Sequence, residues 1–124
     1  MNDPEVTMSR ALTNTNLVAH EKALEAAGDA ITLVMRVPAP LKSIADQVIR
    51  SASSVPANLD EGLGRTGRDR LHFWRIAYGS AKEVDSHMRL LYRAGAVNRT
   101  EAERTLSTFD EVRAMTWRLI NRKS

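Results

Sequence analysis

The sequence predicts an all-α protein, an antiparallel up-down-up-down four-helix bundle, and three observations lead to this prediction. Apolar residues recur at spacings of three and four along four separate segments, which is the period of a helix with one buried face. No segment shows the convincing alternation of apolar and polar residues that a half-buried strand requires. The connections between the four segments are short, so neighbouring helices must run in opposite directions.

The first helix is expected over residues 15–36, after a polar, unpatterned segment over residues 1–14 that we expect to be disordered. The second helix is expected over residues 41–63, because two prolines separate it from the first and the residue before a proline avoids the helical conformation. Pro56 should kink this helix without breaking it, since the apolar stripe keeps its phase across the proline. The stripe of the first helix consists of Leu17, Ala23, Leu24, Ala27, Ile31, Val34 and Met35.

The third helix is expected over residues 67–94, where Gly95 ends it as a C-cap. The fourth is expected over residues 98–122, because Asn98 and the glutamate three residues later are spaced like a capping box. The third stripe passes through Phe73 and leaves Trp74 and Tyr78 on its flank, as Trp117 lies on a flank of the fourth. Apolar flanks on short helices suggest a subunit interface, although snorkelling or a broad core stripe explains them almost as well.

The composition excludes several classes of protein. The chain has 124 residues and no cysteine, so we expect one domain over residues 15–124 with neither a disulfide nor a thiolate metal site. No signal peptide is recognisable and no apolar run approaches the roughly 20 residues of a membrane span, so a cytoplasmic protein without a membrane partner is expected. The net charge of +3 and the pI near 9.7 permit a nucleic-acid partner without requiring one.

The stretch Gly62 to Gly67 reads G-L-G-R-T-G and matches the dinucleotide-binding fingerprint G-x-G-x-x-G letter for letter. That motif works only between a strand and a helix, where the pyrophosphate meets free N–H groups. Here it follows a predicted helix, and no parallel sheet is predicted. We therefore interpret it as a loop in which Gly62 and Gly64 end the second helix and Gly67 turns the chain into the third.

No reaction centre, cofactor or metal site is predicted. Di-iron bundles use Glu-x-x-His pairs, which the sequence lacks, and His72 and His87 are about 22 Å apart along one helix at 1.5 Å per residue. A hairpin folded around residues 64–67 would place Ser51 opposite Ser80 and Glu61 opposite Arg70, where a loop-closing ion pair is expected more than an acid–base pair. Asn58 would lie on the buried face, bonded to the carbonyl freed by Pro56 or to the third helix, with a ligand contact as the alternative.

Two groups of basic residues are expected to meet at one end of the bundle. Arginines surround the predicted loop, and a loop tip followed by the first turn of a helix offers both guanidinium groups and free N–H groups to an anion. His72 and Trp74 lie among them, and an aromatic face can stack on an unpaired base. Arginines near a helix C-terminus also suit the helix dipole, which explains the second group without a ligand. The first group is Arg65, Arg68, Arg70 and Arg75, and the second is Arg113, Arg118, Arg122 and Lys123.

Three segments of the sequence carry a family resemblance: the run from Arg50 to Pro56, Asn58-Leu59-Asp60-Glu61-Gly62, and the segment from Arg75 to Glu83. In these segments the sequence resembles the proteins encoded in intervening sequences of bacterial 23S ribosomal RNA genes. A relative of that family is the accessory protein of diversity-generating retroelements. The resemblance covers about residues 41–97; Asp60 departs from it, as does a first helix that lacks an aromatic residue near its start. The residues that match the family pattern, which we expect to be structural or inter-subunit, are Asn58, Glu61, Gly62, Ser80 and Glu83.

The resemblance implies a bundle that assembles as a ring, often a homopentamer, with a basic surface and no established catalytic activity. The leading hypothesis is therefore a non-enzymatic, self-assembling accessory protein that binds RNA or DNA through Arg65, Arg68, Arg70, Arg75, Arg118 and Arg122. The alternative is a protein-binding ring scaffold whose arginines meet acidic partners. An enzyme that uses Glu61 or His72 is a third and more remote interpretation.

Overall fold

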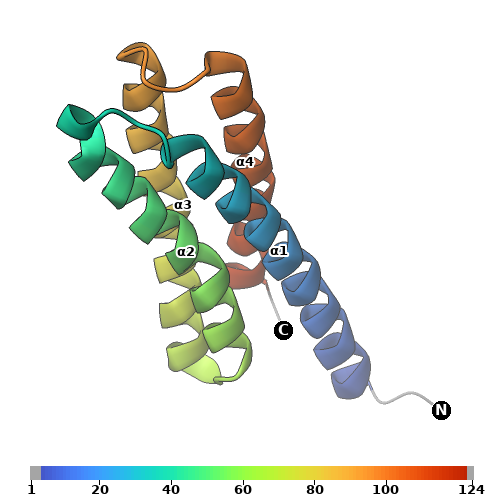
Figure 1. Ribbon diagram of the computed structural model, residues 1–124. Helices are drawn as coiled ribbons and strands as arrows, with labels where there is room; N and C mark the ends of the chain where they lie inside the picture. The colour runs from blue at the N-terminus through green and yellow to red at the C-terminus, as the bar shows by residue number, and fades with distance from the viewer. Residues whose placement is uncertain (1–3, 123–124) are drawn as a thin grey trace.

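The protein is an all-α four-helix bundle in the computed structural model, which describes residues 4–122 and their side chains from residue 11 onward. The helices are α1 (Pro4–Val34), α2 (Lys42–Leu63), α3 (Gly67–Arg93) and α4 (Arg99–Ile120), with a short 3-10 helix, η1 (Ala39–Leu41), before α2. Each helix packs against the next, and α4 closes the bundle against α1 (Figure 1). Residues 4–122 contain no strand, so the predicted fold class is confirmed and the dinucleotide interpretation stays excluded.

Local sequence signals set most helix ends close to the predicted residues. Pro56 lies inside α2 without breaking it. The end of α3 is closed by a Schellman-type turn, in which Gly95 has a φ of 76° and the Ala96 N–H donates to the Leu91 carbonyl at 2.9 Å. Asn98 caps α4, since its side-chain oxygen accepts the Glu101 N–H at 2.9 Å.

Helix α1 begins earlier than the sequence analysis predicted. Residues 4–14 continue the helix toward the N-terminus, and residues 1–3 of the segment expected to be disordered lie outside the described residues. Between Pro4 and Val34 there is no residue that must end a helix, and proline is tolerated in the first turn, where its missing N–H would have no partner. The polar composition of this segment therefore did not mark a helix boundary.

The predicted stripe of α1 combined two opposite faces of the helix. The core is lined by alanines, among them Ala19, Ala23, Ala26 and Ala30, which are all fully buried. The larger residues Leu17, Leu24 and Met35 are 52%, 47% and 73% exposed, and with the partly buried Ile31 they lie seven or four residues apart along the opposite face. We call these four residues the outer α1 seam. Small side chains allow α1 to approach its neighbours closely, so alanine rather than leucine marks its buried face.

The predicted phase of α3 was also wrong by one residue at its start. Trp74 is 1% exposed and belongs to the core, whereas Phe73 is only half-buried. The Trp74 indole packs against Gly62 of α2, where a Cβ atom would overlap the ring. The absence of a side chain at Gly62 therefore makes space for the Trp74 ring, and Gly62 does not end the helix. The C-cap of α2 is Gly64.

The α2–α3 hairpin is shifted by about one helical turn from the predicted register. Ser80 donates a hydrogen bond to the Ser54 hydroxyl at 2.9 Å, rather than facing Ser51. Between α1 and α4, Lys22 and Glu111 form an ion pair at 3.0 Å. No helix within residues 4–122 is long and apolar enough to cross a membrane.

Candidate nucleic-acid interface

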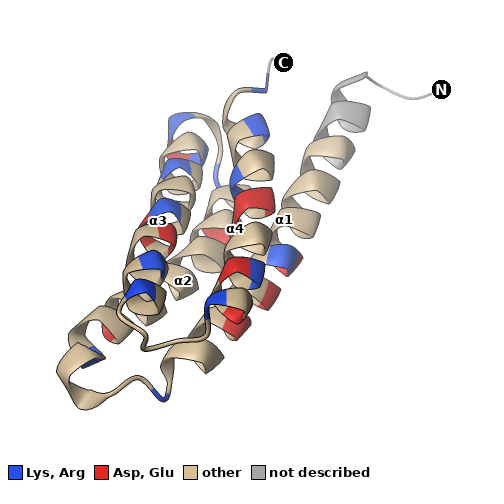
Figure 2. Ribbon diagram, turned by 90° about the horizontal axis from the view of Figure 1, so that it is seen from above, with Lys and Arg blue, Asp and Glu red and all other residues tan. Residues whose placement is uncertain are grey.

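Two basic segments of the chain meet at one end of the bundle, as predicted from the topology. The α2–α3 loop and the C-terminal end of α4 lie at this end, and basic residues mark both in Figure 2. We call it the arginine end, defined by Arg65, Arg68, Arg70, Arg75, Arg118 and Arg122. Lys123, which was predicted to join this group, lies outside the described residues.

Arg70 holds the α2–α3 hairpin together. Its Nε donates to the Gly62 carbonyl and its Nη2 to the Leu63 carbonyl, each at 3.1 Å. Its guanidinium also lies 5.6 Å from the centre of the Trp74 ring. The Gly62 carbonyl also accepts the Arg65 N–H at 3.1 Å, whereas carbonyls at the very end of a helix have no partner within it. Arg70 therefore adds a second donor at Gly62 and supplies a donor to the Leu63 carbonyl.

The prediction of an ion pair between Glu61 and Arg70 is wrong. Glu61 instead pairs with Arg65, four residues later, at 2.7 Å. This spacing brings two side chains together on one helical face, and it persists here because Gly64 keeps a right-handed helical conformation. The hydrogen bond to Glu61 raises the pKa of the Arg65 guanidinium above its ordinary value, and the same group lies 5.1 Å from the centre of the Phe73 ring.

The remaining four arginines of this end are open to solvent. Arg68 and Arg75 are exposed on α3, and Arg118 and Arg122 are exposed at the end of α4. None of the four forms a hydrogen bond or ion pair with another described side chain. The structure thus separates the six predicted arginines into two with partners inside the chain and four whose guanidinium groups are available to a ligand.

The aromatic residues near the loop do not offer the stacking surface that the sequence suggested. Trp74 is buried, so the prediction that it could receive an unpaired base is wrong. His72 is exposed and contacts the edge of Phe73, with ring centres 5.3 Å apart. The exposed tryptophan is Trp117 on α4, which the sequence analysis had placed on a flank of its helix without assigning it to a ligand.

The residues that match the family pattern lie mostly along the contact between α2 and α3. Asn58 is half-buried and donates to the carbonyl and the hydroxyl of Ser54 at 2.8 and 2.9 Å, neither of which was the partner expected for it. Ser80 bonds the same hydroxyl from α3, and Glu83 pairs with Arg50 at 2.9 Å. Ser54 is the centre of this network and was not predicted, although its four-residue spacing from Asn58 was a usable signal.

Glu61 and His72, the two residues of the enzyme interpretation, do not share a depression in the described part of the chain. Glu61 lines a shallow depression together with residues 60 and 63–65, and His72 does not line it. Among the described side chains, no group of three or more His, Asp or Glu residues is placed to hold a metal ion.

The fold and these contacts define a class of protein: a small helical bundle held by an α2–α3 polar network, with a basic end. A model of the 23S rRNA-intervening sequence protein family matches residues 15–118. The chain therefore belongs to the family of 23S rRNA-intervening sequence proteins.

A solved structure supports the same assignment. A protein of unknown function from the S23 ribosomal protein family of Bacteroides thetaiotaomicron VPI-5482 is 25% identical and superposes with a TM-score of 0.77. The match covers 86% of this chain and 97% of that one. No curated protein matches the chain.

Proposed function

We propose that this chain is a non-enzymatic, self-assembling accessory protein that binds nucleic acid, RNA in the first instance, through the arginine end. The observation that supports this most is the group of four exposed arginines, Arg68, Arg75, Arg118 and Arg122, that lack a partner among the described side chains. Arginine presents a planar, permanently charged group that matches phosphate oxygens. Because the start of α3 and the end of α4 lie at the same end of the bundle, several phosphates of one strand can be contacted at once.

The proposal gives Arg65 and Arg70 a different role from the other four arginines. Both had been predicted to bind nucleic acid. Their hydrogen bonds to Glu61 and to the carbonyls of Gly62 and Leu63 support a structural role that shapes the loop. These contacts fix the orientation of both guanidinium groups, so RNA binding in this proposal does not depend on their remaining N–H groups.

Self-assembly is supported by the outer α1 seam. A row of large apolar residues on the outside of a helix is costly to leave in water and is typical of an interface. The family resemblance favours a ring, with five subunits as its expected number. Light scattering tests this part: a mass of several chains supports it, whereas a monomeric mass at micromolar concentration contradicts it.

RNA binding is tested by titrating a labelled RNA with the protein at about 50 mM salt and then at increasing salt. Affinity should fall steeply, because contacts to phosphates release condensed counterions. The matched comparison uses Arg68→Ala with Arg122→Ala against Arg36→Ala with Arg104→Ala, two exposed arginines at the other end of the bundle. Both pairs remove the same charge, and only the first should weaken binding strongly; absence of binding at low salt contradicts the proposal.

The alternative is a ring scaffold that binds acidic proteins through the same arginines. Its supporting observation is that guanidinium groups pair with carboxylates as readily as with phosphates. Capture of an acidic protein that depends on Arg68 and Arg122, together with no measurable RNA binding, would favour the scaffold.

A further inference from the structure

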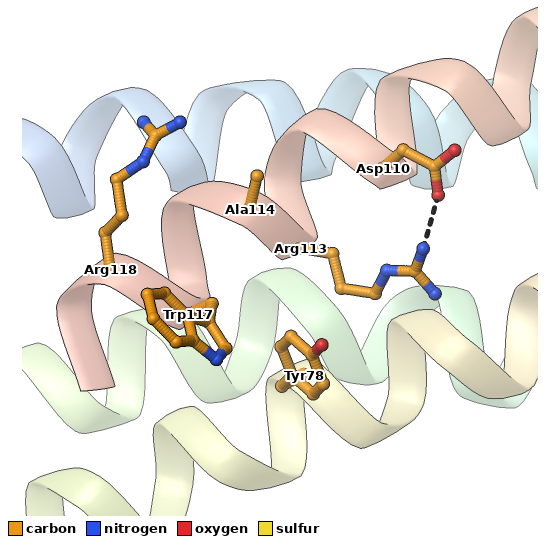
Figure 3. Close-up of a pocket in the computed structure, with 6 residues that line it drawn as sticks. All are labelled: Tyr78, Asp110, Arg113, Ala114, Trp117 and Arg118. Carbon is orange, nitrogen blue, oxygen red and sulfur yellow. Dashed lines mark hydrogen bonds and ion pairs between the residues drawn. The ribbon is translucent and has the colours of Figure 1, made fainter. Parts of the chain in front are cut away.

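A shallow depression lies between α3 and α4, next to the arginine end. It encloses about 360 Å³ and is lined by Tyr78, Asp110, Arg113, Ala114, Trp117 and Arg118. Figure 3 shows the Trp117 and Tyr78 rings on facing sides of neighbouring helices, with Arg113 directed away from them toward Asp110. We call this feature the α3–α4 depression.

Trp117 is the unusual residue of this surface. It is 55% exposed, whereas the other tryptophan of the chain, Trp74, is 1% exposed. Tyr78 is half-buried beside it, so the two aromatic residues form one partly exposed apolar patch (Figure 3). An aromatic ring with an open face is suited to stacking on a nucleobase, and such stacking tolerates any base.

Unpaired cations surround this patch. Arg75 and Lys82 lie about one helical turn on either side of Tyr78, so all three share one side of α3. Both are exposed, as is Arg118 of α4, and none of the three forms an ion pair with another described side chain. Arg75 and Lys82 give the patch a positive border on α3. The Arg118 side chain of α4 starts beside Trp117 and extends away from the two rings toward α1 (Figure 3).

The carboxylates near the patch are already compensated. Asp110 accepts a hydrogen bond from Arg113 at 2.8 Å, and Asp85, one turn beyond Lys82, accepts one from Arg89 at 3.0 Å. A phosphate that approaches Arg75, Lys82 or Arg118 therefore meets little opposing charge.

We propose that the α3–α4 depression binds single-stranded nucleic acid, with an unpaired base stacked on Trp117 and the adjacent phosphates on Arg75, Lys82 and Arg118. This inference rests on the proposed function and specifies its ligand as a single strand. A duplex presents phosphates but keeps its base faces stacked within the helix, so it can reach the arginine end without using Trp117. An acidic protein segment would use the same cations and leave the indole face without a stacking partner.

The fluorescence of the two tryptophans provides a direct test. Single-stranded oligoadenylate of about ten nucleotides, within the usual range for such sites, is titrated into the protein at low salt, and a G·C-rich duplex of the same length, which stays paired under these conditions, is titrated in parallel. The single strand should quench the exposed fraction of the emission. The duplex should leave the emission unchanged, and Trp117→Phe should remove the quenching because Trp74 is buried.

Binding of a labelled oligoadenylate gives the second readout. Trp117→Ala should weaken affinity by about 5- to 150-fold, which corresponds to the loss of one stacked base, and Trp117→Phe should retain most of it. Leu90→Ala is the matched control, because Leu90 is 52% exposed on α3 and lies far from the depression along the helix. This control should bind like the wild type.

The outcomes separate this inference from the proposed function. RNA binding without quenching, and with full affinity in Trp117→Ala, overturns the stacking site but leaves the arginine end as the binding surface. No RNA binding at low salt overturns both. A Trp117 emission that changes with protein concentration alone, with a smaller mass for Trp117→Ala, overturns the inference by assigning the patch to contacts between copies.

Discussion

The α2–α3 hairpin and the α3–α4 depression use the same kinds of side chain in opposite ways. In the hairpin, Trp74 is buried against Gly62 and Arg70 donates to main-chain carbonyls. In the depression, Trp117 and Arg118 are exposed, and their own side chains form no hydrogen bond or ion pair with another described side chain. The residue type alone therefore does not show whether an arginine or a tryptophan stabilises the fold or is available to a ligand. Its contacts within the chain decide between the two roles.

The largest expected contrast is between the two tryptophans. Trp74→Ala should lower the free energy of unfolding by about 3–5 kcal/mol, since it empties a large volume in the core. Trp117→Ala should change it by less than about 0.5 kcal/mol, as surface substitutions do. Urea denaturation followed by circular dichroism measures both, and equal effects would contradict the assignment of one ring to the core and the other to the surface.

Two glycines sharpen the comparison within the packed region. Gly62→Ala should destabilise the protein by about 1–3 kcal/mol, because its Cβ would overlap the Trp74 ring and the core would have to shift. Gly79→Ala on α3 meets no atom within 4 Å and should stabilise the helix by about 0.5–1 kcal/mol. Thermal unfolding of both variants checks the pair, and a tolerated Gly62→Ala would show that the hairpin is not closely packed there.

Among the arginines, Arg70→Ala should cost about 1–2 kcal/mol, because two carbonyls at the end of α2 lose a charged donor. Arg70→Lys should recover little, since a lysine cannot donate to both carbonyls with the same planar geometry. Arg68→Ala is the control and should remain within about 0.5 kcal/mol of the wild type. If Arg68→Ala destabilised the fold as much as Arg70→Ala, the division between structural and available arginines would fail.

The smallest expected effect concerns the polar interior. Asn16 on α1 is 1% exposed, and neither its side-chain oxygen nor its nitrogen has a hydrogen-bond partner among the described residues. Asn16→Leu should therefore raise the free energy of unfolding by about 1 kcal/mol, because it removes a buried amide that lacks compensation. A loss of stability in chemical denaturation would indicate that the amide is hydrogen-bonded in solution.

Strong local signals made the helices predictable. Gly95 and Asn98 stop and start helices through their own backbone or side-chain bonds, so they act regardless of the tertiary structure. The start of α1 was not predictable in this way, because the polar segment before residue 15 contains no obligatory break. Its buried face was also misread, because a leucine is more apolar than an alanine but too large for a close helix contact.

The candidate site was less predictable than the fold, because it depends on register. The observed register of the α2–α3 hairpin differs from the predicted one by about one turn. Ser80 therefore bonds Ser54 rather than facing Ser51, and Arg70 faces main-chain carbonyls instead of Glu61. The sequence identified the arginine clusters and the end of the bundle at which they meet. Which arginines remain without partners follows only from contacts across helices, which spacing along one chain does not determine.

The most direct test of the claim that the exposed arginines bind RNA is the salt dependence of RNA affinity. It is measured for the wild type and for a variant in which alanine replaces Arg68, Arg75, Arg118 and Arg122. The wild type should bind tightly at low salt with a steep dependence. The variant should bind weakly, with a slope of log affinity against log salt reduced by up to about 3, or about 0.7 for each lost contact to a single strand. Equal affinities and equal slopes would show that these arginines do not contact phosphate.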